Sequence, residues 1–310
     1  MASQMGIRKK IKKYIDKCFS KSYHLYLDSE LEGYLRDMKH KTVLNRSSEL
    51  LKRLNQADMS CFTIEDAYQA VERSNNDAIK KLLSDLVKRG LLMRLKKGLY
   101  YTIPYEQNPD IFMPNWHLIA AYLSKGMNYY IGYYSALEVH SLITQPSLQE
   151  QIIVDKQVKP AIIKIRDIEF RFIYHNKKHF FGTKNIWIDD FNRVKCSDFE
   201  KTLIDCLYKP QYAGGIVEIS KALFKLKEKL DYGKLFEYIK KFNSQAVVKR
   251  LGYLLELFEI NHPVLEQLNK IKTKSFTQLD PSLPKEGKMI SKWSLQLNLD
   301  TETIRSSVET

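Results

Sequence analysis

The spacing of apolar residues between positions 45 and 104 predicts three helices followed by a basic hairpin. Leucines recur at helical intervals in the first stretch, and Thr63 then precedes an acidic run, as an N-cap residue does. A third helix begins at Asn75 or Asn76 and ends at Gly90. Its apolar stripe consists of Ile79, Leu82, Leu83 and Leu86. Two short strands around a Lys-Lys-Gly turn complete the order of a winged helix-turn-helix.

Beyond residue 104 the pattern mixes strands with helices. Strands are predicted at 151–154, 161–165, 168–174, 186–188, 194–196 and, at the end of the chain, 293–297. Helices are predicted at 116–123, 135–142, 197–207, 216–226, 235–242 and 247–258. Ser197 and Glu200 are spaced as a capping box at the start of one of these helices. The predicted fold class is α+β: an N-terminal winged helix-turn-helix at 45–104, after a charged extension at 1–44, and then a mixed α/β domain at 105–310.

The chain carries a formal net charge of +14 and has a pI of about 9.3. A surplus of this size favours polyanionic partners, a nucleic acid or an anionic membrane. The four cysteines form no C-x-x-C pair and stand at no zinc-finger spacing from histidines, which favours a reducing compartment. No apolar run approaches the roughly 18 residues of a membrane span, and the basic N-terminus lacks the apolar region of a signal peptide. We therefore expect a cytoplasmic protein without a membrane partner.

Positive charge gathers on the predicted third helix and hairpin. Between Ser74 and Tyr101 stand seven lysines and arginines against two aspartates. Residues off the apolar stripe point outward, where an asparagine can read adenine in the major groove and a lysine can neutralise phosphate. The expected DNA contacts are Ser74, Asn75, Asn76, Lys80, Lys81 and Ser84 on the helix and Arg94, Lys96, Lys97 and Tyr100 on the hairpin. The alternative is a solvated basic face on a helical domain that contacts protein.

Residues that resemble catalytic or metal sites each have a simpler interpretation. His175 and His179 form an H-x-x-x-H pair in a lysine-rich turn without a third ligand, so surface histidines are expected there. The acidic residues of a metal-dependent nuclease are resembled by two groups, Asp189-Asp190 and Asp198 with Glu200. However, Glu200 serves the predicted capping box and Asp198 suits the helix dipole. We expect no catalytic residue, no metal ion and no cofactor.

Three further clusters are interpreted in the same way. Gly214-Gly215 lacks the Lys-Ser/Thr of a P-loop and is typical of a turn before a helix. Lys249-Arg250 is expected at a solvated helix end, with a second basic surface as the alternative. Core packing rather than stacking on bases is expected for the aromatic group Tyr129, Tyr130, Tyr133 and Tyr134. The chain also lacks the Gly-Ser and carboxylate pattern of a nucleotidyltransferase.

Several of these segments, taken in order, resemble the AbiEi family of antitoxins and transcriptional regulators. They are LVKRGLL at 86–92, RLKKGLY at 94–100, YIGYYSAL at 130–137, CSDFEKTLID at 196–205, Pro210 with YAGG at 212–215, and RLGYLLE at 250–256. None is specific alone, because R-x-K-K-G-L-Y occurs in many winged helices. The ordered set, across roughly residues 50–259, carries the resemblance, and residues 1–43 lie outside it.

The resemblance implies the antitoxin of a type IV toxin–antitoxin system of abortive infection, a form of phage defence. It implies a repressor that binds inverted repeats in the double-stranded DNA of its own promoter. It further implies a nucleotidyltransferase-like toxin as functional partner, whose effect is counteracted without a stable complex. Two copies per operator are expected, because inverted repeats present two half-sites about one DNA turn apart. Two alternatives remain open: an antitoxin that binds its toxin directly, and an RNA-binding protein.

Overall fold

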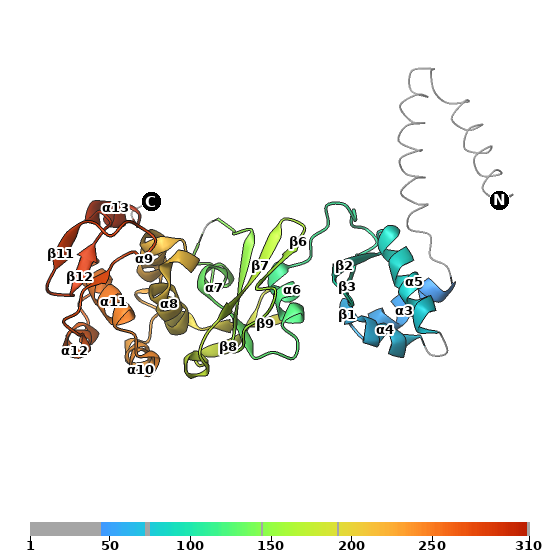
Figure 1. The fold of residues 1–310 in the computed structure, drawn as a ribbon, viewed down its shortest axis with the longest axis horizontal. Coiled ribbons are helices and arrows are strands. Elements are labelled where there is room, and N and C mark those ends of the chain that lie inside the picture. Colours follow the sequence, from blue (N-terminus) through green and yellow to red (C-terminus); the bar gives the residue numbers. More distant parts are fainter. Residues whose placement is uncertain (1–44, 72–74, 144, 191, 309–310) are drawn as a thin grey trace, which may run out of the picture. The chain divides into compact units, whose positions relative to one another are not determined.

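A computed structural model describes residues 45–71, 75–143, 145–190 and 192–308. The described residues form two compact units, which divide between residues 113 and 114 (Figure 1). The boundary predicted from the sequence, at residue 104, lies nine residues earlier. The predicted extension at 1–44 lies outside the described residues.

The described part of the first unit contains three helices and a small antiparallel sheet. The helices are α3 (Asn45–Gln56), α4 (Ile64–Ala70) and α5 (Asn76–Lys88), and the strands are β1 (Cys61–Thr63), β2 (Leu92–Lys96) and β3 (Leu99–Thr102). The sheet order is β1-β3-β2, so the β2–β3 hairpin is extended by a strand that precedes α4. This is the arrangement of a winged helix-turn-helix, and the α+β fold class is confirmed.

Local signals place the helices of this unit. Thr63 caps α4 through a capping box, because its hydroxyl accepts from the Asp66 amide at 3.2 Å while the Asp66 carboxylate accepts from the Thr63 amide at 2.7 Å. Of the predicted apolar stripe of α5, Ile79, Leu83 and Leu86 are buried and Leu82 is half-buried. The stripe packs in one core with α3, α4 and the sheet, made by Leu50, Leu54, Phe62, Ala67, Val71, Ile79, Leu83, Leu86, Leu91, Leu92 and Tyr100.

The second unit is built on a six-stranded mixed sheet of order β6-β7-β5-β4-β9-β8. The strands are β4 (Tyr129–Ile131), β5 (Gln149–Val154), β6 (Ile162–Ile165), β7 (Ile168–Tyr174), β8 (Thr183–Trp187) and β9 (Arg193–Ser197). Neighbours pair parallel at β5–β7 and β4–β9 and antiparallel elsewhere. The helices α6 (Trp116–Leu123) and α7 (Tyr133–Val139) pack against β5 and β9, and a short 3-10 turn, η1 (Lys177–His179), follows β7.

A helical layer and a second small sheet complete this unit. The helices are α8 (Phe199–Tyr208), α9 (Gly215–Leu226), α10 (Tyr232–Phe242), α11 (Gln245–Leu257), α12 (Val264–Ile271) and α13 (Thr301–Ser306), with a 3-10 turn, η2 (Pro210–Tyr212), before α9. The small sheet has the order β10-β12-β11, from β10 (Thr277–Gln278), β11 (Lys288–Ile290) and β12 (Leu295–Leu297). The described helices are too short to cross a membrane.

The structure corrects one cap and adds elements that the sequence analysis missed. Asp198, not Ser197, caps α8, since its carboxylate accepts from the Lys201 amide at 2.9 Å. Glu200 accepts from the Asp231 amide instead of closing a capping box. The elements missed are β1, β4, β10, β11, α12 and α13.

A buried ion pair fastens α6 to the large sheet. Nδ1 of His117 lies 2.9 and 3.0 Å from the two carboxylate oxygens of Glu150 on β5, and both side chains are buried. Burial lowers the pKa of His117, but the charge and hydrogen bond of Glu150, with the charge of Glu138, raise it by more. The pKa therefore lies above its ordinary value of 6.5.

This pair should make stability depend on pH. Protonated His117 stabilises the fold fully below pH 6.5, and the contribution is lost as the pH rises through the raised pKa of the folded state. A His117→Gln variant should therefore lose more unfolding free energy at pH about 5.5 than at about 8.5. Urea unfolding followed by circular dichroism at the two pH values measures the difference, and Glu150→Gln should show the same profile. Equal losses at both pH values would contradict the assignment.

Candidate nucleic-acid interface

Helix α5 presents a polar face opposite its buried stripe. Asn76, Lys80, Lys81 and Ser84 are all exposed, while Ile79, on the opposite face, is 1% exposed. Side chains three, four and seven residues apart share one side of a helix, so Lys81, Ser84 and Lys88 form an outward row. The sequence analysis did not include Lys88 among the expected contacts, although its spacing of seven from Lys81 places it on this row.

The start of α5 uses part of this polar set for its own stability. The side-chain oxygen of Asn75 caps the helix by accepting from the Asp77 amide at 3.1 Å, and its NH2 group stays available for a base edge. Lys80 forms an exposed ion pair with Asp77 at 3.0 Å. Such exposed pairs contribute little to stability, so Lys80 can exchange its partner for a phosphate at little cost. Ser74, also expected at this interface, lies outside the described residues.

The β2–β3 hairpin is a short wing with an exposed basic edge. Arg94, Lys96 and Lys97 are exposed. The two-residue turn Lys97-Gly98 requires a left-handed residue, which Gly98 supplies with φ of 78°. The Gly98 carbonyl accepts from the Ile64 amide at 2.9 Å, so the wing is anchored to the first residue of α4.

Tyr100 does not belong to this surface, and its prediction as a DNA contact is corrected here. It is 8% exposed, and its ring stacks on Phe62 with centroids 5.8 Å apart. Both rings lie in the core of the unit. Tyr100 therefore supports the sheet from within and does not face outward with the basic residues of the hairpin.

His175 and His179 are buried rather than at the surface, so that expectation was wrong. The His175 Nε2 lies 2.6 Å from the Tyr133 hydroxyl, and the His179 ring stacks on Phe242 at 3.9 Å. Burial, together with the charges of Lys201 and Lys209, lowers the pKa of His175 to about 2. His175 is thus neutral at pH 7 and serves the core.

The acidic side chains at the start of α8 and within it form ion pairs with lysines of the same unit. Lys201 and Asp205 are both fully buried and form an ion pair, and the Tyr130 hydroxyl accepts from Lys201 at 2.8 Å and donates to Asp205 at 3.0 Å. Burial lowers the pKa of Lys201 and raises that of Asp205. Asp198 and Glu200 both pair with Lys234, at 3.0 and 2.6 Å. Within the described residues, no group of three or more metal-ligating side chains comes together.

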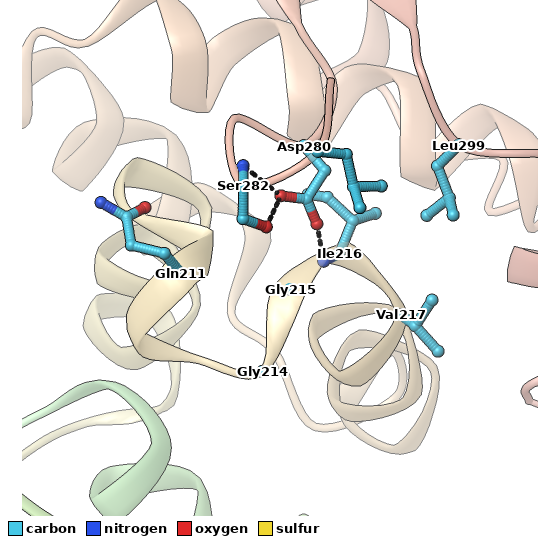
Figure 2. Close-up of a pocket in the computed structure, with 9 residues that line it drawn as sticks. Gln211, Gly214, Gly215, Ile216, Val217, Asp280, Ser282 and Leu299 are labelled. Carbon is cyan, nitrogen blue, oxygen red and sulfur yellow. Dashed lines mark hydrogen bonds between the residues drawn. The ribbon is translucent and has the colours of Figure 1, made fainter. Parts of the chain in front are cut away.

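Gly214 lies in the turn before α9 and Gly215 is the first residue of the helix, so the predicted turn ends one residue earlier than expected. Both have a positive φ, 77° and 82°. Figure 2 shows the Asp280 carboxylate at the first turn of α9, where it accepts from the Ile216 amide at 2.9 Å and from Ser282. A Cβ at residue 215 would lie 2.9 Å from Asp280 Oδ2. The pocket beside these residues therefore has an internal carboxylate where a phosphate would otherwise bind.

Lys249 and Arg250 are buried too, so the expected solvated helix end was wrong. Arg250 donates to the carbonyl oxygens of Leu207 at 2.7 Å and of Gln278 at 2.9 Å. Lys249 donates to the carbonyl of Ser275. The two cations connect α11 to the end of α8 and to the segment that contains β10, and they form no second basic surface.

Comparison with known proteins assigns part of the chain. Residues 49–103 match a family described as "Transcriptional regulator, AbiEi antitoxin". The match covers most of α3 and the rest of the winged helix, and it confirms the resemblance to AbiEi antitoxins over this part of the chain. The comparison with curated proteins found no match.

A solved structure extends the likeness at the level of fold. The crystal structure of the RV2827C protein from Mycobacterium tuberculosis is similar, with a TM-score of 0.65 and 14% sequence identity. The alignment covers 87% of this chain and 96% of that one. At this identity the similarity shows a shared fold and carries nothing further.

Proposed function

We propose that this protein is a sequence-specific DNA-binding repressor of its own promoter and the antitoxin of a type IV toxin–antitoxin system. The observation that supports this most is the exposed polar row of α5, flanked by the basic wing, in a unit similar to AbiEi antitoxin regulators. A helix with such a row can serve as a recognition helix, because the major groove of B-DNA admits an α-helix. We propose no catalytic activity for the protein, and we place its function in the cytoplasm.

The contacts divide into two kinds. Asn76 and Ser84 carry the polar groups that can read base edges, whereas the cations of the helix and wing neutralise phosphates. The cations are Lys80, Lys81, Arg94, Lys96 and Lys97. The site would be an inverted repeat occupied by two copies. The toxin, a nucleotidyltransferase-like enzyme, would be counteracted without a lasting complex.

Salt dependence of DNA binding tests the wing. With about five phosphate contacts, log K should fall with log salt at a slope of about −4 to −5, and Lys96→Ala/Lys97→Ala should flatten the slope by about two. The control Lys285→Ala/Lys288→Ala removes the same charge from exposed positions of the second unit and should leave the slope unchanged. Fluorescence anisotropy with the promoter duplex gives both slopes. An unaltered slope in the wing variant would refute the assignment.

The same anisotropy assay, with operator and unrelated duplexes, tests which residues of α5 contact bases. Asn76→Ala should weaken operator binding while leaving binding to unrelated duplex nearly unchanged, because it removes a base contact worth about 1–3 kcal/mol. Lys81→Ala should weaken both to a similar degree, since a phosphate contact carries no sequence information. Co-purification of the toxin encoded beside the gene would instead favour an antitoxin that works by direct binding.

A further inference from the structure

The outer hairpin of the large sheet, β8–β9, has two different faces. Side chains alternate along a strand, and on one face Ile186, Val194 and Cys196 join the core with α6 and α7 elements. The other face has Trp187 opposite Arg193 and Asn185 opposite Lys195. Three of these four are exposed and Lys195 is half-buried. The hairpin therefore presents an aromatic, a guanidinium, an amide and an ammonium group together.

Trp187 is the centre of this surface. Its side chain is 54% exposed, and the Arg193 guanidinium carbon lies 3.7 Å from the ring centroid. A cation over one ring face restrains the orientation of the ring, and the exposed fraction of 54% leaves part of the ring accessible. A tryptophan that is exposed to this extent contributes less to folding stability than a buried one. The arrangement is thus a preformed stacking platform.

The surroundings of Trp187 do not suit an apolar protein interface. Within β8 and β9 Trp187 is the only exposed large apolar residue. Ile162 and Tyr174, the exposed apolar residues of β6 and β7, lie toward the opposite edge of the sheet. A protein interface buries an apolar centre of many side chains, whereas among the described residues of this hairpin one exposed ring stands beside polar groups.

We propose that the Trp187 face of β8–β9 binds an unpaired polynucleotide strand, with one base stacked on Trp187 and phosphates held by Arg193 and Lys195. Stacking on an aromatic side chain requires an accessible base face, which a duplex hides. Asn185, beside the ring, has the donor and acceptor needed for a base edge. The turn of the hairpin carries two exposed carboxylates, Asp189 and Asp190, and Asp189 accepts from the Asn192 amide at 2.7 Å. Lys241 lies over Phe181 at 4.5 Å, before the start of β8 and at the other end of this strand from Trp187.

The test measures binding of the full-length protein to labelled oligouridylate and oligothymidylate of a dozen nucleotides at low salt. Trp187→Ala should weaken binding about 5- to 150-fold, the effect of losing one stacked base. Trp187→Phe, which keeps a ring, should retain most of the affinity, and Tyr174→Ala, an exposed aromatic near the other edge, should match the wild type. Promoter-duplex binding should be unchanged in all three, which separates this proposal from the winged-helix function.

The two oligonucleotides distinguish the sources of the strand. Tighter binding of oligouridylate identifies RNA as the strand, and tighter binding of oligothymidylate identifies unpaired DNA. Either result supports the proposed surface if Trp187→Ala reduces binding of the preferred oligonucleotide to the background signal of the assay. Wild-type affinity in Trp187→Ala, or the absence of oligonucleotide binding by the wild type, overturns the proposal. Thermal unfolding of each variant verifies that the exposed substitutions leave the fold intact.

Discussion

Replacing Lys201 by methionine is expected to lower the free energy of unfolding by about 3–5 kcal/mol, because the buried carboxylate of Asp205 would lose its cation. The Tyr130 hydroxyl, which accepts from Lys201 and donates to Asp205, would lose half of its hydrogen bonds. Domains are stable by only about 5–15 kcal/mol, so the variant should be close to unfolding at physiological temperature. Urea unfolding followed by circular dichroism measures the loss.

A second substitution distinguishes a lost charge partner from lost packing. In the double variant Lys201→Met/Asp205→Asn the buried charge is gone and the amide still accepts from Tyr130, so most of the stability should return. Lys221→Met is the matched control, since its ion pair with Glu218 at 2.7 Å is partly exposed and should contribute about 0–1 kcal/mol. A double variant as unstable as Lys201→Met alone would show that the ion pair is not the cause.

The winged helix could be predicted from sequence because its signals are local. The Thr63 cap, the helical stripe of α5 and the glycine of the Lys97-Gly98 turn each depend on residues fewer than eight positions apart. The strand β1 escaped prediction for the opposite reason. It has three residues, too few to show a period, and exists because Cys61 pairs with Tyr101, far along the chain.

Burial of charged residues was the part that the sequence could not show. Arg250 resembles any solvated cation in a helix, but its carbonyl partners at residues 207 and 278 lie 43 and 28 positions away. His175 likewise follows a strand in a lysine-rich segment, and its place in the core depends on Tyr133, 42 residues earlier. Long-range packing alone decides these positions, so a local pattern assigns them to the surface.

The same limit applies to the candidate interface. Helical periodicity correctly placed Asn76, Lys81 and Ser84 outward, because a helix repeats its faces every three to four residues. It could not place Tyr100, since the strand β3 has two consecutive buried residues, Leu99 and Tyr100, instead of an alternation. The Trp187 surface was missed because its neighbour Arg193 belongs to the next strand, across a turn.

Gly252→Ala is expected to destabilise the second unit, against the usual preference of helices. Alanine in a helix interior is favoured over glycine by about 1 kcal/mol. However, a Cβ at residue 252 on α11 would lie 2.1 Å from Cζ3 of Trp293. Trp293 is 2% exposed, and its indole nitrogen donates to Glu256 Oε2 at 2.5 Å, so the ring cannot give way freely. We expect a net loss of about 1–3 kcal/mol, the usual cost of overpacking.

Introducing Gly252→Ala into the wild type and into a Trp293→Leu variant tests whether the contact with Trp293 causes the loss of stability. Trp293→Leu alone should cost about 3 kcal/mol through lost packing. Adding Gly252→Ala to it should then be neutral or stabilise by up to about 1 kcal/mol, because the ring that excluded the methyl group is gone. Equal losses from Gly252→Ala in both backgrounds would mean that the glycine is required by the backbone. A reversal of sign would show that α11 needs glycine there because Trp293 packs directly on its backbone.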